Sequence, residues 1–193
     1  MPAATNVWIV LIRGINIGGR WLAMAKLVAL MEKAGCTDVQ TYIQSGNAVC
    51  KSRVADAPTL AAKIARAIEA SEGYLPSVMV LSRADFEAAA TANPYPVDDH
   101  KALHLFFCAE APADLAPLER VRIPSEQYAQ IGTTFYFYAP AGFGLSKLAG
   151  SFEKLTKVRA TARNWRTVTA LRGMIAAAEA ATSPPPMTRA KKS

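Results

Sequence analysis

The chain has 193 residues, of which 51% are apolar and 19% are charged, and its formal net charge is +7. This length suits one compact domain or two small, closely packed halves, and it allows a core to form without metal or disulfide staples. Apolar runs stay well short of the roughly 20 residues that cross a bilayer, and the first residues lack the basic and apolar pattern of an export signal. We therefore expect a cytoplasmic protein, of bacterial type, that does not associate with membranes.

Cysteine usage argues against a metal centre. Cys36, Cys50 and Cys108 are widely spaced, and no two of them form a Cys-x-x-Cys pair. An odd number of cysteines at such spacings disfavours both a zinc site and a disulfide framework. We interpret them as small hydrophobic residues, and we predict neither a metal nor a cofactor.

The positive charge is concentrated in one part of the chain. Residues 1–142 carry 12 basic and 13 acidic side chains, whereas residues 143–173 carry 7 basic and 1 acidic. A further 3 basic residues lie in 183–193. A localised positive surface of this kind is typical of proteins that bind phosphate-bearing partners.

The first eighty residues alternate between strand and helix patterns. The apolar run at 7–12 predicts a strand, and apolar residues at helical spacing predict a helix at 23–34. Two β-type runs follow at 39–44 and 47–50, and the Ser-Gly pair at 45–46 predicts a hairpin with a two-residue link.

A second helix and a fourth strand complete this half. Asp56 and Pro58 are typical of a helix start, and Gly73 of a helix end. The run at 77–82 then predicts a strand. The order strand, helix, strand, strand, helix, strand is that of the ferredoxin-like fold, in which two helices cover one face of an antiparallel sheet.

The rest of the chain partly repeats this plan. Ser82 and Asp85 resemble a capping box that opens another helix. The fold class is α+β: a ferredoxin-like half at 1–82, a second α+β half at 83–182 packed on the first, and a disordered basic tail at 183–193. The elements expected in the second half are a helix at 83–92, a strand at 102–108, a short helix at 113–121, strands at 126–130 and 133–139, and C-terminal helices at 145–157 and 165–181.

Several stretches resemble, in order, an uncharacterised bacterial family named domain of unknown function 1697. The resemblance extends from about residue 7 to about residue 173. It implies an α+β fold with ferredoxin-like character, and it implies no activity. The stretches are LIRGINIGG, MAKLVALMEKAGCTDVQTYIQSGNAVC, ALHLFF, PAGFGLSKL and ATARNWRTV.

The loop RGINIGG at 13–19 is a candidate anion site. Glycines between a strand and a helix allow backbone N–H groups to approach a phosphate, although the spacing matches neither the dinucleotide fingerprint nor the P-loop. Arg13 follows an apolar strand, so it needs either a ligand phosphate or an internal carboxylate as partner. The ligand-binding residues predicted in this loop are Arg13, Gly14, Asn16, Gly18 and Gly19.

The basic segment offers charge, hydroxyl groups and an aromatic ring. These are the groups that hold a phosphate backbone and unpaired bases, although a solvated helix face also carries lysines. Asn47 suits a turn and Asn164 suits a helix cap, so both have structural interpretations. The ligand-binding residues predicted outside the loop are Ser45, Asn47, Ser146, Lys147, Arg163, Asn164 and Trp165.

Catalysis has weaker support in the sequence. The common hydrolase and metalloprotease motifs are missing. His104 and Glu153 are the candidate proton carriers, with a buried, hydrogen-bonded imidazole as the alternative for His104 and an orienting role for Glu153. The sequence therefore leaves open whether the protein is an enzyme.

Three functional hypotheses follow. The first is a protein of unknown activity that binds a phosphate-containing partner, nucleic acid above all, through the basic segment and the glycine loop. The alternative is an enzyme that acts on an anionic or phosphorylated small molecule in a pocket between the two halves, where Arg13, Asn47 and Lys147 would converge. The third is that the polar residues only interlock the halves. No oligomeric state is predicted.

Overall fold

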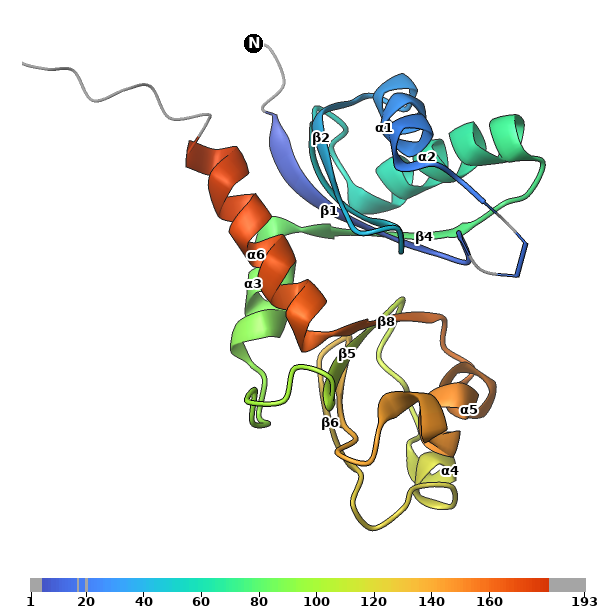
Figure 1. Cartoon of the computed structure of the whole chain (residues 1–193), viewed down its shortest axis with the longest axis vertical. Helices are drawn as coiled ribbons and strands as arrows, with labels where there is room; N and C mark the ends of the chain where they lie inside the picture. Colours follow the sequence, from blue (N-terminus) through green and yellow to red (C-terminus); the bar gives the residue numbers. More distant parts are fainter. Residues whose placement is uncertain (1–4, 17, 20, 181–193) are drawn as a thin grey trace, which may run out of the picture.

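The computed structural model describes residues 5–16, 18–19 and 21–180, and the predicted tail at 183–193 lies outside this range. Within the described residues the chain forms two four-stranded antiparallel sheets with helices around and between them (Figure 1). The α+β class expected from the sequence is confirmed.

The first sheet has the ferredoxin-like arrangement. Its strand order is β2-β3-β1-β4, and all neighbouring strands are antiparallel. Asp56 accepts a hydrogen bond from the Thr59 N–H at the start of the second helix, and Gly73 ends that helix with a φ of 75°. The elements are β1 (Asn6–Arg13), α1 (Met24–Lys33), β2 (Cys36–Tyr42), β3 (Asn47–Ser52), α2 (Ala57–Glu72) and β4 (Ser77–Ser82).

The second half repeats this plan more completely than the sequence indicates. Its sheet has the order β6-β7-β5-β8, which is the same arrangement as in the first sheet. The elements are α3 (Arg83–Thr91), β5 (Leu103–Cys108), α4 (Ala116–Glu119), β6 (Gln127–Ile131), β7 (Thr134–Tyr138), a 3-10 turn η1 (Phe143–Leu145), α5 (Lys147–Thr156), β8 (Ala160–Asn164) and α6 (Trp165–Ala180).

Strand β8 is the element that the sequence did not predict. Its residues, Ala160 to Asn164, alternate over only four positions and have two alanines as their only apolar side chains, so the strand signal in the sequence is weak. It forms because the free edge of β5 accepts it, with Leu105 opposite Arg163 in the register. A short strand defined by a distant neighbour leaves little local signal.

The first hairpin also differs from the prediction. Its loop has four residues, 43–46, rather than two, because Tyr42 already pairs with Asn47. Ile43 and Gly46 have positive φ values of 46° and 74°. A Cβ on Gly46 would lie 2.6 Å from the Ile12 carbonyl oxygen, so only glycine allows this turn to pack against the end of β1.

Three hydrophobic clusters fill the molecule in layers. The first lies between the first sheet and helices α1 and α2, and the third lies between the second sheet and helices α4 and α5. The central cluster joins both sheets to α3 and α6, which Figure 1 shows side by side. The Tyr136 hydroxyl donates to the Ala89 carbonyl at 2.7 Å across this layer. Each sheet therefore has both faces packed against other elements.

Candidate functional site

Arg163 lies at the centre of the polar residues that the sequence singled out. It projects from β8 toward the end of β1 and the hairpin turn at 43–46, and burial lowers the pKa of its guanidinium to about 10, so it stays charged at neutral pH. All five of its N–H groups are engaged within the protein. Nε donates to Asn47 Oδ1, Nη1 to Thr161 Oγ1 at 3.0 Å and the Ala162 carbonyl at 2.8 Å, and Nη2 to the Ile12 carbonyl at 2.9 Å and the Ser45 carbonyl at 3.2 Å.

Asn47 connects this guanidinium to the hairpin. Its side chain is completely buried. Its amide nitrogen donates to the Ser45 hydroxyl at 2.8 Å and the Tyr42 carbonyl at 3.3 Å, while its oxygen accepts from Arg163. The turn residues predicted to bind a ligand are thus hydrogen-bonded to one another.

Asn16 closes the glycine loop. Its oxygen accepts from the Leu22 N–H at 2.7 Å, and its nitrogen donates to the carbonyls of Leu22 at 3.1 Å and Gln44 at 2.8 Å. This side chain therefore ties the loop to its own far end and to the hairpin. Left-handed φ values occur in the loop at Gly14 (82°), Asn16 (57°), Gly18 (59°) and Gly19 (81°).

Arg13 has an internal carboxylate as its partner. Its guanidinium forms an ion pair with Glu153 of α5. The other oxygen of Glu153 accepts from the Ala160 N–H at 2.8 Å, and Arg13 reaches the Ala160 carbonyl at 3.4 Å. Of the two partners that the sequence allowed for Arg13, the internal one is present, and Glu153 orients an arginine and the start of β8.

Two further candidates act as helix caps. The Ser146 hydroxyl accepts from the Ala149 N–H at 3.1 Å at the start of α5, and the Asn164 oxygen accepts from the Thr167 N–H at 2.9 Å at the start of α6. Trp165 is partly buried against the central cluster. These contacts are structural.

His104 is a buried imidazole. Its ring stacks on Phe143 with the centroids 3.7 Å apart, and its Nδ1 atom has no hydrogen-bond partner among the described residues. Burial lowers the pKa of His104 to about 4, so the ring is neutral at physiological pH.

Lys147 lies apart from Arg13, Asn47 and Arg163. It is exposed at the start of α5 and lines a cavity of about 400 Å³ together with Arg120, Arg122 and the buried Glu126. The structure brings Asn47 and Arg163 together at the end of β1, where Arg13 pairs with Glu153, but Lys147 lines a different cavity. The convergence of Arg13, Asn47 and Lys147 that the small-molecule hypothesis required is therefore not present.

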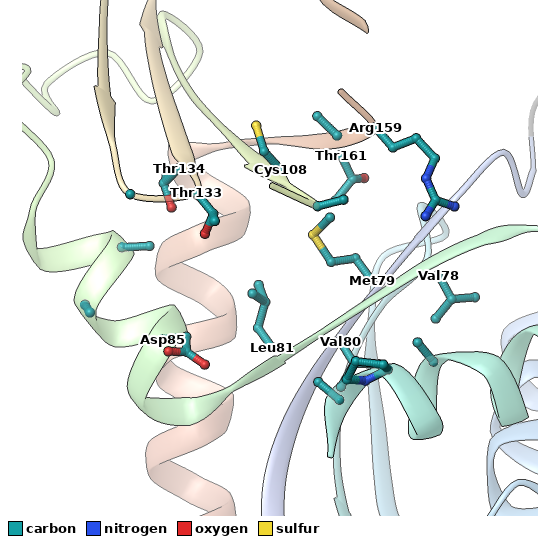
Figure 2. Close-up of a pocket in the computed structure, with 18 of the residues that line it drawn as sticks. Val78, Met79, Val80, Leu81, Asp85, Cys108, Thr133, Thr134, Arg159 and Thr161 are labelled. Atoms are coloured by element: carbon teal, nitrogen blue, oxygen red, sulfur yellow. The ribbon is translucent and has the colours of Figure 1, made fainter. Parts of the chain in front are cut away.

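A larger cleft of about 640 Å³ lies between the two halves (Figure 2). It borders the five consecutive residues 77–81 of β4, the beginning of α2, one face of α3 and the rim of the second sheet. The alternative hypothesis placed a pocket between the two halves, but none of the site residues predicted from the sequence lines this cleft, because its walls come from segments that are far apart in the chain.

Polar and apolar groups share the lining of this cleft. Met79 and Leu81 provide apolar surface, and Thr133 and Thr161 are at the second sheet.

Arg159 is exposed, and no ion pair within the described residues includes it. Figure 2 shows its side chain running from the start of β8 toward β4. Arg159 belongs to the basic segment 143–173, but nothing in the sequence distinguishes it from the other basic residues there.

Comparison with known protein families shows which family this chain belongs to. Residues 5–136 match the family model described as Protein of unknown function (DUF1697). The chain belongs to this family. The family resemblance is thereby confirmed. Three of the five quoted stretches lie within the matched residues, and PAGFGLSKL and ATARNWRTV lie beyond them.

Solved structures of similar fold include that of a conserved bacterial protein from Streptococcus pneumoniae, which is 23% identical, with a TM-score of 0.63, over 89% of this chain and 99% of that chain. A second structure, described as that of a proposed glycine cleavage system transcriptional repressor, is 12% identical over 83% of this chain and 97% of that chain. Its TM-score of 0.22 is too low to show a shared fold. A comparison with curated proteins finds no match.

Among the described residues, no helix has the length and apolar character needed to span a membrane.

Proposed function

We propose that this protein binds an anionic ligand in the cleft between its two halves, with Arg159 as the cationic contact. The observation that carries the proposal is an exposed guanidinium, outside every ion pair of the described residues, at a cleft of about 640 Å³ with an apolar floor. Ligand pockets combine mostly apolar walls with a few oriented polar groups. A guanidinium binds a phosphate or a carboxylate through two parallel hydrogen bonds.

The lining of the cleft supports binding rather than chemistry on the ligand. Neither candidate proton carrier, His104 or Glu153, lines it. Asp85 does, but its carboxylate already accepts a hydrogen bond from the Ser82 hydroxyl at 2.5 Å. The Cys108 thiol is buried, which raises its pKa to about 12 and keeps it protonated and unreactive.

Nucleic acid is the second candidate ligand, at a different surface. Lys147, Lys154 and Lys157 are exposed along α5 and the residue that follows it, and none forms an ion pair within the described part of the chain. Lys147 and Lys154 are seven residues apart and so share one face of the helix. This lysine strip favours phosphate contacts. It ranks second because both faces of each sheet are packed, so bases cannot stack on an open sheet as they do in some nucleic-acid-binding proteins.

The test is a binding panel on three variants. The probes are inorganic phosphate, a nucleoside monophosphate, a dicarboxylate, a short peptide and a single-stranded oligonucleotide, measured by calorimetry and by ligand-induced thermal shift. We expect Arg159→Gln to weaken binding of the cleft anion at least about tenfold, because a charged hydrogen bond is lost. Arg166→Gln is the matched control, since Arg166 is an exposed arginine of the same segment that does not line the cleft.

The double variant Lys154→Gln, Lys157→Gln separates the two candidates. If nucleic acid binds the lysine strip, this variant loses oligonucleotide affinity and its salt dependence becomes shallower, while Arg159→Gln retains both. Equal anion affinities of the wild type and Arg159→Gln would contradict the cleft proposal.

A further inference from the structure

The cleft runs along the free edge of β4. In the first sheet β4 is the terminal strand and pairs only with β1 among the described residues. Successive side chains of a strand point to opposite faces, yet residues 77–81 all line the cleft. All five residues can line one cavity only if that cavity lies along the edge of the strand, where it meets side chains from both faces. Figure 2 shows Met79 and Leu81 on one side of the β4 ribbon and Val78 and Val80 on the other.

The register of the sheet identifies the backbone groups at this edge. The Ile12 N–H donates to the Gly46 carbonyl at 2.7 Å, on the side of β1 that faces β3. Backbone groups of successive residues point to opposite sides of a strand, so those of the preceding residue, Leu11, point to β4. Leu11 lies opposite Met79 in that pairing. Met79 therefore uses its N–H and C=O groups toward β1. Val78 and Val80 direct theirs into the cleft.

Small residues line both sides of that edge. Ala57 and Ala61 of α2 border it on one side, and Ala88 of α3 and Ala92 at the end of that helix on the other. Alanines leave room for the alternating side chains of an added strand. The five β4 residues span about 17 Å at roughly 3.3 Å per residue, which matches an extended segment of about five residues.

We propose that the ligand of the cleft is an extended peptide segment that adds to the first sheet beside β4. The inference rests on the proposed function and specifies its ligand. In this mode of binding, main-chain hydrogen bonds supply the affinity and side-chain pockets supply the specificity. Here the cleft-facing groups of Val78 and Val80 supply the main-chain partners.

The charges at the two ends of the cleft set the direction of the added strand. Figure 2 shows Arg159 near Val78, at the beginning of β4, and Asp85 beyond Leu81, at its end. A peptide with its carboxylate at Arg159 and its amino end toward Asp85 runs antiparallel to β4. The preferred ligand therefore has a free C-terminal carboxylate.

The first experiment uses pentapeptides with free ends and randomised central positions, and follows amide hydrogen exchange by NMR. We expect binding to slow exchange at Val78 and Val80 and to leave Met79 and Leu81 unchanged, because these two already pair with β1. Converting the peptide carboxylate to an amide should weaken binding about tenfold in the wild type and have little effect in Arg159→Gln.

The second experiment methylates each backbone nitrogen of a bound pentapeptide in turn. Only alternate N–H groups of an added strand face its neighbour, so we expect losses of about tenfold at alternate positions. On the protein, Val78→Pro removes a cleft-facing N–H and should reduce peptide affinity similarly, whereas Val78→Ala keeps the N–H and should bind normally. The exchange measurement is independent of whether Val78→Pro folds.

The outcomes separate this inference from the proposed function. If phosphate or dicarboxylate binds in an Arg159-dependent way while no pentapeptide binds, strand addition is overturned and the anion site stands. Peptide binding with no change at Val78 and Val80 and no alternation also overturns it. If no probe depends on Arg159, both proposals fail.

Discussion

At the scale of single residues, burial decides the charge of His104. Its ring is stacked on Phe143, 9% of the residue is exposed, and its pKa is about 4. An imidazole in an unfolded chain has a pKa near 6.5. The native state thus excludes a proton that the unfolded state accepts, which links folding to pH.

This linkage predicts a loss of stability in mild acid. Between pH 6.5 and 4 the unfolded chain binds more protons at His104 than the native protein, so the free energy of unfolding falls as the pH falls, by up to about 3 kcal/mol. Urea denaturation at several pH values should show this slope in the wild type and not in His104→Leu. Carboxylates whose pKa values are lowered in the native protein, such as Asp56 and Glu72, destabilise both proteins in acid from the low end of this window downward, so the difference between the two slopes measures the effect of His104. Identical slopes in the two proteins would contradict the prediction.

At the scale of elements, Arg163 joins three parts of the chain. From β8 it donates hydrogen bonds to the Ile12 carbonyl near the end of β1 and to the Ser45 carbonyl in the hairpin between β2 and β3. A buried guanidinium with all donors paired contributes to stability only while its partners remain. Asn47 is the buried side-chain partner of Arg163, and its removal also breaks the hydrogen bonds to Tyr42 and Ser45.

We therefore expect Asn47→Ala to lower the free energy of unfolding by about 2–3 kcal/mol, because the Arg163 Nε–H and the Tyr42 carbonyl lose their partner in a buried site. Denaturant titration measures the change. Gln44→Ala is the control, since the Gln44 side chain is exposed beside the same turn and should change stability by less than about 0.5 kcal/mol. In a double-mutant cycle with Arg163→Ala, additive effects would show that the two side chains are not coupled.

At the scale of the whole molecule, the two halves share the central cluster. Ile9 of the first sheet, Phe107 of the second, and Leu171 of α6 belong to the same packed group. Each half also has a cluster of its own on the outer face of its sheet, but the inner faces of both sheets are covered by α3 and α6 in the shared central cluster. We expect the described residues to unfold in one cooperative transition.

Leu171→Ala tests this cooperativity. Leu171 is fully buried, so its truncation should cost about 2–5 kcal/mol and lower the midpoint of the whole transition in calorimetry. Thr169→Ala, at an exposed position of the same helix, should leave the midpoint nearly unchanged. A second transition that stays at the wild-type midpoint in Leu171→Ala would show that the halves unfold separately.

Local rules in the sequence determined most of the fold and the family. The caps at Asp56 and Ser82, the apolar spacing of α2 and the mostly apolar run of β5 act within a few residues, so their outcome is predictable without knowing the rest of the chain. The sequence singled out Arg13, Asn47 and Arg163 individually, but it left open whether the glycine loop, the hairpin turn and the basic segment meet in space.

Only the tertiary structure decided what those residues contact. Arg13 could meet a ligand or a carboxylate, and the packing of α5 supplies Glu153. Strand β8 exists because β5 has an edge to pair with, and the cleft exists because β4 has an edge left free. These features depend on contacts between residues about 50 to 150 positions apart, whose formation reflects chain topology rather than local propensity.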